Sequence, residues 1–236
     1  MALRALIKRP ACLFIYYFKY GISSFFNFAF LSYNLDSYRT FHKHPEFNKL
    51  LSYFIESNKS NNCGDLARLW FVILNTKQII DHSIVGYFAE LGVWYGNIFH
   101  IHAYFSSLSN RRLFLFDTFS GFDSRNLSGI DRNVNVQFQH NSLLRVQKKL
   151  IDHLDRITFV PGYFSESLDG QQMSEKFPVV SLDCDLYPSS KDALAFFFPR
   201  MSIVGLFSYM IIQANIGQVV RAQLMNFFLR LMNRSF

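Results

Sequence analysis

Acidic residues are missing from the last part of this 236-residue sequence, since none follows Asp192. An even distribution of the 17 Asp and Glu residues would place about three there. Charged residues are also few, at 17%, against 50% hydrophobic ones, which excludes a disordered chain. The net charge of +7 is modest, and no basic–aromatic ladder favours nucleic acid as a partner.

Cysteine is scarce as well. Cys12, Cys63 and Cys184 are few and odd in number, which argues against a disulfide framework and favours a reducing, cytoplasmic location. No G-x-x-x-x-G-K-[ST] motif is present, which argues against a phosphate-gripping nucleotidase. The segment GVWYGN lacks the G-x-G-x-x-G pattern, so a nicotinamide-dependent sugar-nucleotide enzyme is a weaker hypothesis.

The aromatic N-terminus lacks an uninterrupted apolar run of about 18 residues, because Lys8, Arg9 and Lys19 interrupt it. This argues against a spanning helix, and no clear cleavage site indicates a signal peptide. We expect residues 1–82 to form a helical extension that packs on the next domain or on another subunit, as in a homo-oligomer. Peripheral membrane contact is the minor alternative.

From residue 83 onward, apolar runs alternate with stretches of helical spacing. Strands are expected at 83–92, 111–119, 156–164 and 177–187, and helices at 97–108, in the second half of 132–154 and at 188–201. Ser189 and Asp192 have the spacing of a capping box. The alternation predicts an α/β fold over residues 83–204, with a mostly parallel sheet and helices on both faces.

Candidate site residues stand at the expected strand ends, because ligands of parallel sheets bind beyond the carboxyl ends of the strands. Glu90, Gly92 and Gly96 lie in AELGVWYGN after the first strand. The two glycines allow the backbone to approach a ligand closely. In the alternative interpretation, they allow the strand to pack tightly on the following helix. Asp117 ends the second strand, where an acid can accept ribose hydroxyls; a helix cap or a solvated loop acid is the alternative.

Asp183 and Asp185 end the fourth strand, in LDCD. Acids two apart on a strand point to the same face, and two carboxylates at a strand end suit a divalent cation. In the alternative interpretation, Asp185 caps the following helix and Asp183 meets a backbone amide.

Four blocks give these features a common context. GYFAELGVWYGN, RLFLFDTFSGF, DRITFVPGYFSESL and FPVVSLDCDLYPSSKDALAFFFPRMS resemble, in order and spacing, the macrocin O-methyltransferase (TylF-type) family. The resemblance implies a Rossmann-like class I methyltransferase fold and methylation of a hydroxyl, typically on a sugar of a saccharide, glycoside or natural product. It also implies two cofactors, S-adenosylmethionine and a divalent metal such as Mg²⁺.

The resemblance also implies roles for individual residues. The cofactor would lie over the Gly92–Gly96 turn, with Asp117 on its ribose. Asp183 matches the metal-binding acid of the family and is the candidate catalytic residue, and Asp185 is a second metal ligand. The full set of implied cofactor residues is Glu90, Gly92, Gly96, Asp117, Thr118 and Phe119.

The chain departs from the family at Tyr95, often Arg there, and beyond residue 204, where the family has an H-D-Y or D-D-Y block and then a helix resembling A-V-D-E-F. One shifted reading frame gives GAT (Asp) across Met210–Ile211 and GAA (Glu) across Met225–Asn226. At other positions synonymous codons leave the bases undetermined, and there the shifted frame is compatible with FIFIHDYSSQYWAGCKSAVDEFF, a sequence that contains both missing blocks.

We therefore hypothesise a frame slip near residues 202–205 that removes the fifth-strand acid and impairs metal binding and activity. The alternative is a non-catalytic protein of the same fold that binds a nucleoside or a partner. Within the aberrant tail, residues 205–236, we still expect 205–212 to fill the fifth-strand position. Residues 217–234 have the spacing of a basic amphipathic helix.

Overall fold

The computed structural model describes residues 45–57, 66–94, 98–132, 139–168, 173, 176–209 and 227. The chain divides into two compact units, with the boundary between Leu74 and Asn75. In the first unit, α3 (Pro45–Ser57) and the start of α4 (Leu66–Asp81) bring the rings of Phe47 and Trp70 into edge-to-face contact. None of the helices in the described part of the chain is long and apolar enough to cross a membrane.

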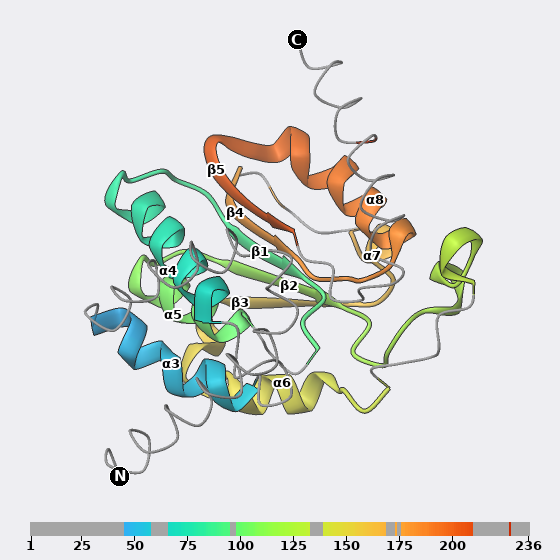
Figure 1. Cartoon of the computed structure of the whole chain (residues 1–236), viewed down its shortest axis with the longest axis horizontal. Coiled ribbons are helices and arrows are strands. Elements are labelled where there is room, and N and C mark those ends of the chain that lie inside the picture. Colours follow the sequence, from blue (N-terminus) through green and yellow to red (C-terminus); the bar gives the residue numbers. More distant parts are fainter. Residues whose placement is uncertain are drawn as a thin grey trace, which may run out of the picture. The chain divides into compact units, whose positions relative to one another are not determined.

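A five-stranded, fully parallel sheet forms the centre of the second unit, in the order β3-β2-β1-β4-β5 (Figure 1). Its strands are β1 (Phe88–Leu91), β2 (Leu113–Asp117), β3 (Ile157–Pro161), β4 (Phe177–Leu182) and β5 (Met201–Tyr209). This confirms the predicted α/β architecture, and the order matches the first five strands of a doubly wound 3-2-1-4-5-6 sheet. The first four strands are shorter than predicted; β1, for example, stops where Gly92 turns left-handed, at φ +87°.

Helices cover both faces of this sheet, as predicted (Figure 1). On one face α5 (Phe99–Leu108) contacts β1 and β2, with the 3-10 helix η4 (Ile151–Arg156) beside it; α6 (Leu143–Lys149) adjoins η4. On the other face α8 (Tyr187–Phe197) packs on β4 and contacts α7 (Phe164–Ser167). The loop after β2 carries two short 3-10 helices, η2 (Ser124–Asn126) and η3 (Gly129–Asp131).

Phenylalanine dominates the core between the sheet and α8. The rings of Phe116, Phe164 and Phe197 lie 5.2–5.8 Å apart, and Phe177 meets Phe197 edge-on at 5.2 Å. All four side chains are buried. Buried edge-to-face pairs stabilise a core beyond the area they bury, so these rings fix α7 and α8 on the sheet.

The predicted fifth strand is confirmed as far as Tyr209, pairing parallel to β4 from Val179↔Leu206 to Leu182↔Tyr209. It starts earlier than predicted, at Met201, because the short turn η5 (Phe198–Arg200) leads from α8 directly into the sheet. Residues 210–212 lie outside the described residues, as does the predicted tail helix apart from Phe227. That residue packs, half-buried, against the core cluster.

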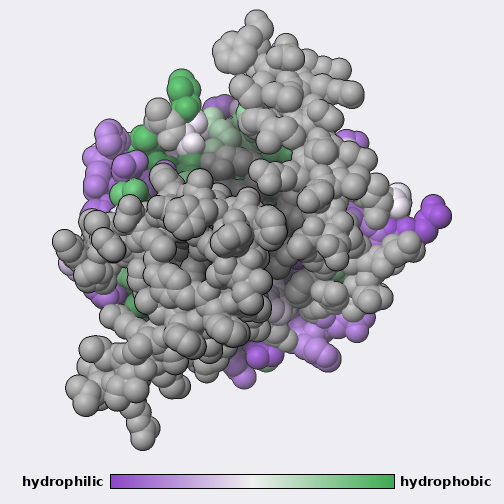
Figure 2. Space-filling view, viewed as in Figure 1, coloured by the Kyte–Doolittle hydropathy of each residue, from purple (hydrophilic) through white to green (hydrophobic). Residues whose placement is uncertain are grey.

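A bulge interrupts β5 near its start. Phe177 pairs with Met201 but Val179 pairs with Leu206, so the interval on β5 is longer than that on β4. Gly205 lies in the bulge, where a Cβ would stand 3.1 Å from the carbonyl oxygen of Pro178. Ile203, in the same segment, is fully exposed. Apolar surface is visible in Figure 2 in the region where β5 lies in Figure 1.

The capping-box prediction for Ser189 and Asp192 is wrong. Helix α8 begins at Tyr187, two residues before Ser189, with Pro188 in its first turn. Asp192 instead accepts a hydrogen bond from Ser165 Oγ at 2.6 Å. The amide of Tyr187 is capped from elsewhere in the chain, as described below.

Candidate active site

Sharp turns follow the first four strands at the carboxyl edge of the sheet. Residues with left-handed backbone occur after each of them: Gly92 (φ +87°), Trp94 (+40°), Phe119 (+54°), Gly162 (+126°) and Asp185 (+54°). Such conformations cost about 1–3 kcal/mol for non-glycine residues and concentrate at functional sites. The strand order reverses between β1 and β4, which is where ligands of doubly wound sheets bind.

The turns after β1 and β4 lie directly against each other. The amide of Asp183 donates to the carbonyl oxygen of Leu91 at 2.8 Å. A Cβ on Gly92 would overlap the carbonyl oxygen of Asp183 and stand 3.0 Å from the amide nitrogen of Cys184. The glycine at position 92 is therefore needed for backbone packing against the β4 turn.

Asp117 binds the turns after β1 and β2 together. Its Oδ2 accepts hydrogen bonds from the amides of Val93 at 2.7 Å and Trp94 at 3.1 Å, and its Oδ1 accepts one from Phe119 at 2.6 Å. Burial raises the pKa of Asp117, and the three amide hydrogen bonds oppose that rise. The Thr118 side chain also contributes a hydrogen bond that lowers this pKa, and Asp117 is half-buried.

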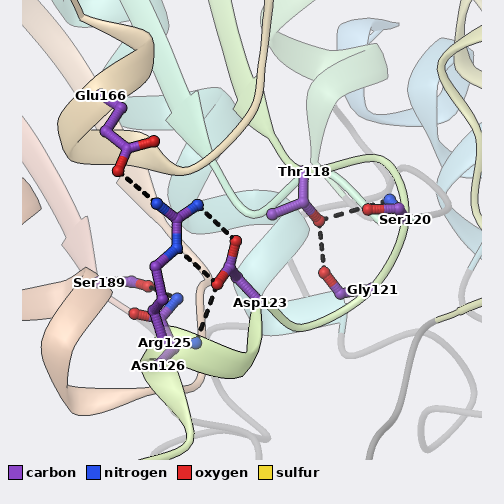
Figure 3. A network of polar contacts seen from close by, with 8 residues as sticks. All are labelled: Thr118, Ser120, Gly121, Asp123, Arg125, Asn126, Glu166 and Ser189. Carbon is purple, nitrogen blue, oxygen red and sulfur yellow. Dashed lines mark hydrogen bonds and ion pairs between the residues drawn. The ribbon is translucent and has the colours of Figure 1, made fainter.

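Thr118 and Phe119 continue the turn that Asp117 begins. Thr118 Oγ1 donates to the carbonyl oxygen of Gly121 and accepts from the amide of Ser120 (Figure 3). The side chain of Phe119 is buried and meets Phe159 of β3 edge-on at 6.3 Å. The predicted residues Asp117, Thr118 and Phe119 thus form one tightly bonded loop at the edge of the sheet.

Glu90 lies apart from that loop. It is buried within β1, and its Oε2 stands 3.9 Å from Nε2 of the buried His102 on α5. Side chains alternate along a strand, so Glu90 shares the face of Phe88, whose ring also lies near His102. Gly96, the other predicted glycine, lies outside the described residues.

Asp183 and Asp185 lie beyond the end of β4, which stops at Leu182. The expectation that they share a strand face is therefore wrong, because the alternation of a strand does not extend into the turn. Both are half-buried, and Asp185 has a left-handed backbone. Between them, Cys184 Sγ lies 3.1 Å from Ser190 Oγ, and burial raises the pKa of this thiol to about 12.

These acids do not make a magnesium site by themselves. The described residues contain no group of three Asp, Glu, His or Cys side chains able to hold one ion. Magnesium in proteins needs octahedrally arranged oxygens and well-placed carboxylates. On β5, whose described part ends at Tyr209, Met210 comes next and no acid follows. The residues that the structure describes therefore do not fit the metal.

The sequence matches the family model described as "Macrocin-O-methyltransferase (TylF)" over residues 66–227. The chain belongs to the macrocin O-methyltransferase family. The match covers all five strands of the sheet, including β5 and its departure from the expected acids.

Two similar proteins come from Streptomyces. The 8-demethyl-8-(2,3-dimethoxy-alpha-L-rhamnosyl)-tetracenomycin-C 4'-O-methyltransferase of Streptomyces olivaceus is 30% identical over 142 residues, 53% of this chain and 52% of that one. The demethyldecarbamoylnovobiocin O-methyltransferase of Streptomyces niveus is 27% identical over 146 residues, 55% and 53% of the two chains. The chain thus spans about half the length of these relatives.

One solved structure supports the fold assignment. The O-methyltransferase NovP is similar with a TM-score of 0.59 and 21% identity, over 70% of this chain and 74% of that one. At this identity the likeness concerns the fold, and it agrees with the strand order. The macrocin O-methyltransferase family therefore accounts for the class I methyltransferase architecture predicted from the four sequence blocks.

The structure adds polar residues that the sequence did not indicate. They lie in the loop after β2: Asn126 donates through Nδ2 to Ser189 Oγ at 2.6 Å, and Asp131 Oδ2 accepts from the amide of Tyr187 at 2.7 Å (Figure 3 shows the first pair). Both are buried, Asp131 fully. Because their partners are more than 50 residues away, no local pattern marks them.

Proposed function

We propose that this chain binds S-adenosylmethionine at the carboxyl edge of the sheet and belongs to a lineage that methylates a sugar hydroxyl on a saccharide, glycoside or natural product. The proposal rests on the hydrogen bonds of Asp117, which join the turns after β1 and β2 at the strand ends. Family membership supports it, as does the rhamnosyl group in the name of the S. olivaceus relative.

The turn around Asp117 fits a nucleoside. Its carboxylate is held in place by three amides and is half-buried, so a ribose hydroxyl can approach it at the carboxyl edge of the sheet. Glu90, Thr118, Phe119 and the Gly92–Gly96 turn are the other residues that we assign to the cofactor. When bound, the cofactor supplies the electrophilic methyl group.

Asp183 is the residue that we assign to the acceptor. Its backbone is fixed by the Leu91 carbonyl and by the contact with Gly92, so Asp183 follows β4 at the point where the strand order reverses. A carboxylate there can take the proton of a sugar hydroxyl as the oxygen attacks the methyl carbon. Asp185 would orient the acceptor beside it.

A second candidate function is binding without turnover. The described residues hold no three-ligand metal group, and the sequence carries no acid after Asp192. Without a metal, nothing acidifies the acceptor hydroxyl, an effect worth several kcal/mol. We propose that this chain is impaired in catalysis by a slip of the reading frame near residues 202–205, while its nucleoside site, which precedes the slip, remains.

The test leaves the protein unchanged and alters the ligand. Calorimetry compares S-adenosylhomocysteine with its 2'-deoxy and 3'-deoxy analogues. We expect the parent compound to bind and at least one analogue to bind about tenfold more weakly, through the loss of about 1–2 kcal/mol. Absence of binding by the parent compound would refute the nucleoside site.

The catalytic part of the proposal needs a second comparison. Sugar acceptors are screened with methyl-labelled cofactor, using the chain as it stands and a chain with the shifted frame restored from codon 202 onward. We expect transfer by the restored chain alone. Metal-dependent transfer by the present chain would contradict the frame-slip account.

A further inference from the structure

The loop after β2 contacts the first turn of α8 at two buried points. Asn126, at the end of η2, donates to Ser189 Oγ, and Asp131, at the end of η3, accepts from the amide of Tyr187. Their exposed fractions are 5% and 0%. Buried hydrogen bonds are costly to break, because each partner is left without water, so these two contacts hold the loop against the helix.

Asp131 supplies the cap that α8 lacks in its own sequence. The N-cap position is Leu186, whose side chain cannot accept a hydrogen bond, and Pro188 follows in the first turn. The first amides of a helix need acceptors, and a carboxylate there also interacts favourably with the helix dipole. Here the carboxylate comes from a residue 56 positions earlier in the chain.

Capping at Tyr187 fixes one end of the turn that carries the two acids of the candidate site. Tyr187 follows the turn of Asp183, Cys184, Asp185 and Leu186 without a break. At the start of that turn the Asp183 amide is bound to Leu91, and at its end the Tyr187 amide is bound to Asp131. The turn between is short and has a left-handed residue, Asp185, so its conformation depends on both anchors.

A third contact keeps the loop itself in shape. Arg125 binds Asp123 through two nitrogens, at 2.7 and 2.8 Å, and pairs with Glu166 of α7 (Figure 3). Its guanidinium also stacks 4.1 Å over the ring of Tyr163. The arginine and Glu166 are exposed, so each pair contributes little on its own. Together they orient η2, from which Asn126 reaches α8.

We propose that Asp131 is a positioning residue: its carboxylate holds the turn that carries Asp183 and Asp185, so that the position of these acids depends on the loop after β2. The role assigned to Asp183 rests on the proposed function; the mechanical link between loop and turn does not. Loss of the Asp131 carboxylate frees one end of the turn without touching either acid.

Cys184 reports on this turn. It lies between the two acids, partly buried against the core cluster, with its Sγ 3.1 Å from Ser190 Oγ of α8. Any opening of the turn exposes it to water and to thiol reagents. The rate of its modification therefore measures the position of the turn without any requirement for methyl transfer.

The experiment follows alkylation of Cys184 by N-ethylmaleimide in the full chain, with peptide mass spectrometry to separate it from Cys12 and Cys63. We expect Asp131→Ala to raise the rate about tenfold or more. Asp131→Asn keeps an oxygen that accepts the Tyr187 amide and should stay within about twofold of the unmodified chain. Asp152→Ala, at an exposed acid of η4, is the matched control.

Each outcome decides the question. An unchanged rate in Asp131→Ala, or a rate in Asp131→Asn as high as in Asp131→Ala, would overturn the proposal. If circular dichroism shows that Asp131→Ala is unfolded, Asp131→Glu, which displaces the carboxylate by one methylene, replaces it with the same expected rise. Failure of the unmodified chain to bind S-adenosylhomocysteine would sink the proposed function and leave the Cys184 result standing.

Discussion

The backbones of Gly92 and Asp183 touch, so that the turn after β1 and the turn after β4 form a single packed unit. No side chain fits between them, because a Cβ at position 92 would overlap the Asp183 carbonyl oxygen. A glycine that sequence patterns associate with ligand approach thus serves first to seat a candidate catalytic acid. A change at Gly92 must displace Asp183.

Replacement of Gly92 by alanine should destabilise the fold strongly. The new Cβ meets backbone atoms that cannot move aside, and φ +87° is itself unfavourable for alanine. We expect a loss of about 3 kcal/mol or more in urea unfolding. Gly129→Ala is the matched control, since Gly129 also has positive φ (+58°) but no atom of the described residues lies within 4 Å of its Cβ position. It should cost about 1 kcal/mol, and equal losses would show that contact with Asp183 is unimportant.

Asp117→Ala should also reduce stability, whatever the ligand. The change leaves the amides of Val93, Trp94 and Phe119 without their acceptor. Each buried, unpaired donor costs about 1–3 kcal/mol where water does not replace the carboxylate. We expect a loss of about 2–4 kcal/mol, measured by urea unfolding, against little change in Asp155→Ala, at an exposed acid. A fully stable Asp117→Ala variant would show that these bonds are not formed.

Phe197→Ala should open a cavity at the centre of the phenylalanine core. The ring is fully buried and meets Phe116, Phe164 and Phe177. Deletion of a buried phenylalanine ring typically costs about 3–5 kcal/mol. Phe71→Ala, at a residue 48% exposed, should cost less than about 1.5 kcal/mol. Similar losses in the two variants would be incompatible with the packing described.

Stability should fall on mild acidification because of His100. Burial, with the charges of Lys149 and His153, lowers the pKa of this residue to about 4. An unfolded histidine takes up its proton near pH 6.5. Between pH 6.5 and 4, His100 is therefore protonated in the unfolded chain but not in the folded chain. The free energy of unfolding should therefore drop as pH falls through this window, by up to about 3 kcal/mol.

Urea titrations at several pH values measure this drop. His100→Gln should flatten the dependence, while His140→Gln, at an exposed loop residue, should leave it unchanged. A profile that is equally steep in His100→Gln would assign the effect to other groups.

The sequence was sufficient for the elements that depend on apolar periodicity. The five strands, α5 and the run of α8 all follow from local pattern, and the four family blocks locate the turns of the site. Local pattern failed where a contact comes from far along the chain. Ser189 and Asp192 have the spacing of a cap, but Asp131 supplies it. Asp183 and Asp185 have the spacing of a strand pair, but the strand ends before them.

The bulge in β5 has a consequence for how this strand tolerates changes of length. In a regular strand, one inserted or deleted residue turns every later side chain to the opposite side of the sheet. Here the additional residues around Gly205 absorb such a phase error, with Ile203 in solvent and Leu206 buried. After the bulge, the sheet can therefore accept a segment whose alternation of apolar and polar residues is out of step with the segment before it. The bulge brings the apolar side chains of the later segment back to the buried side.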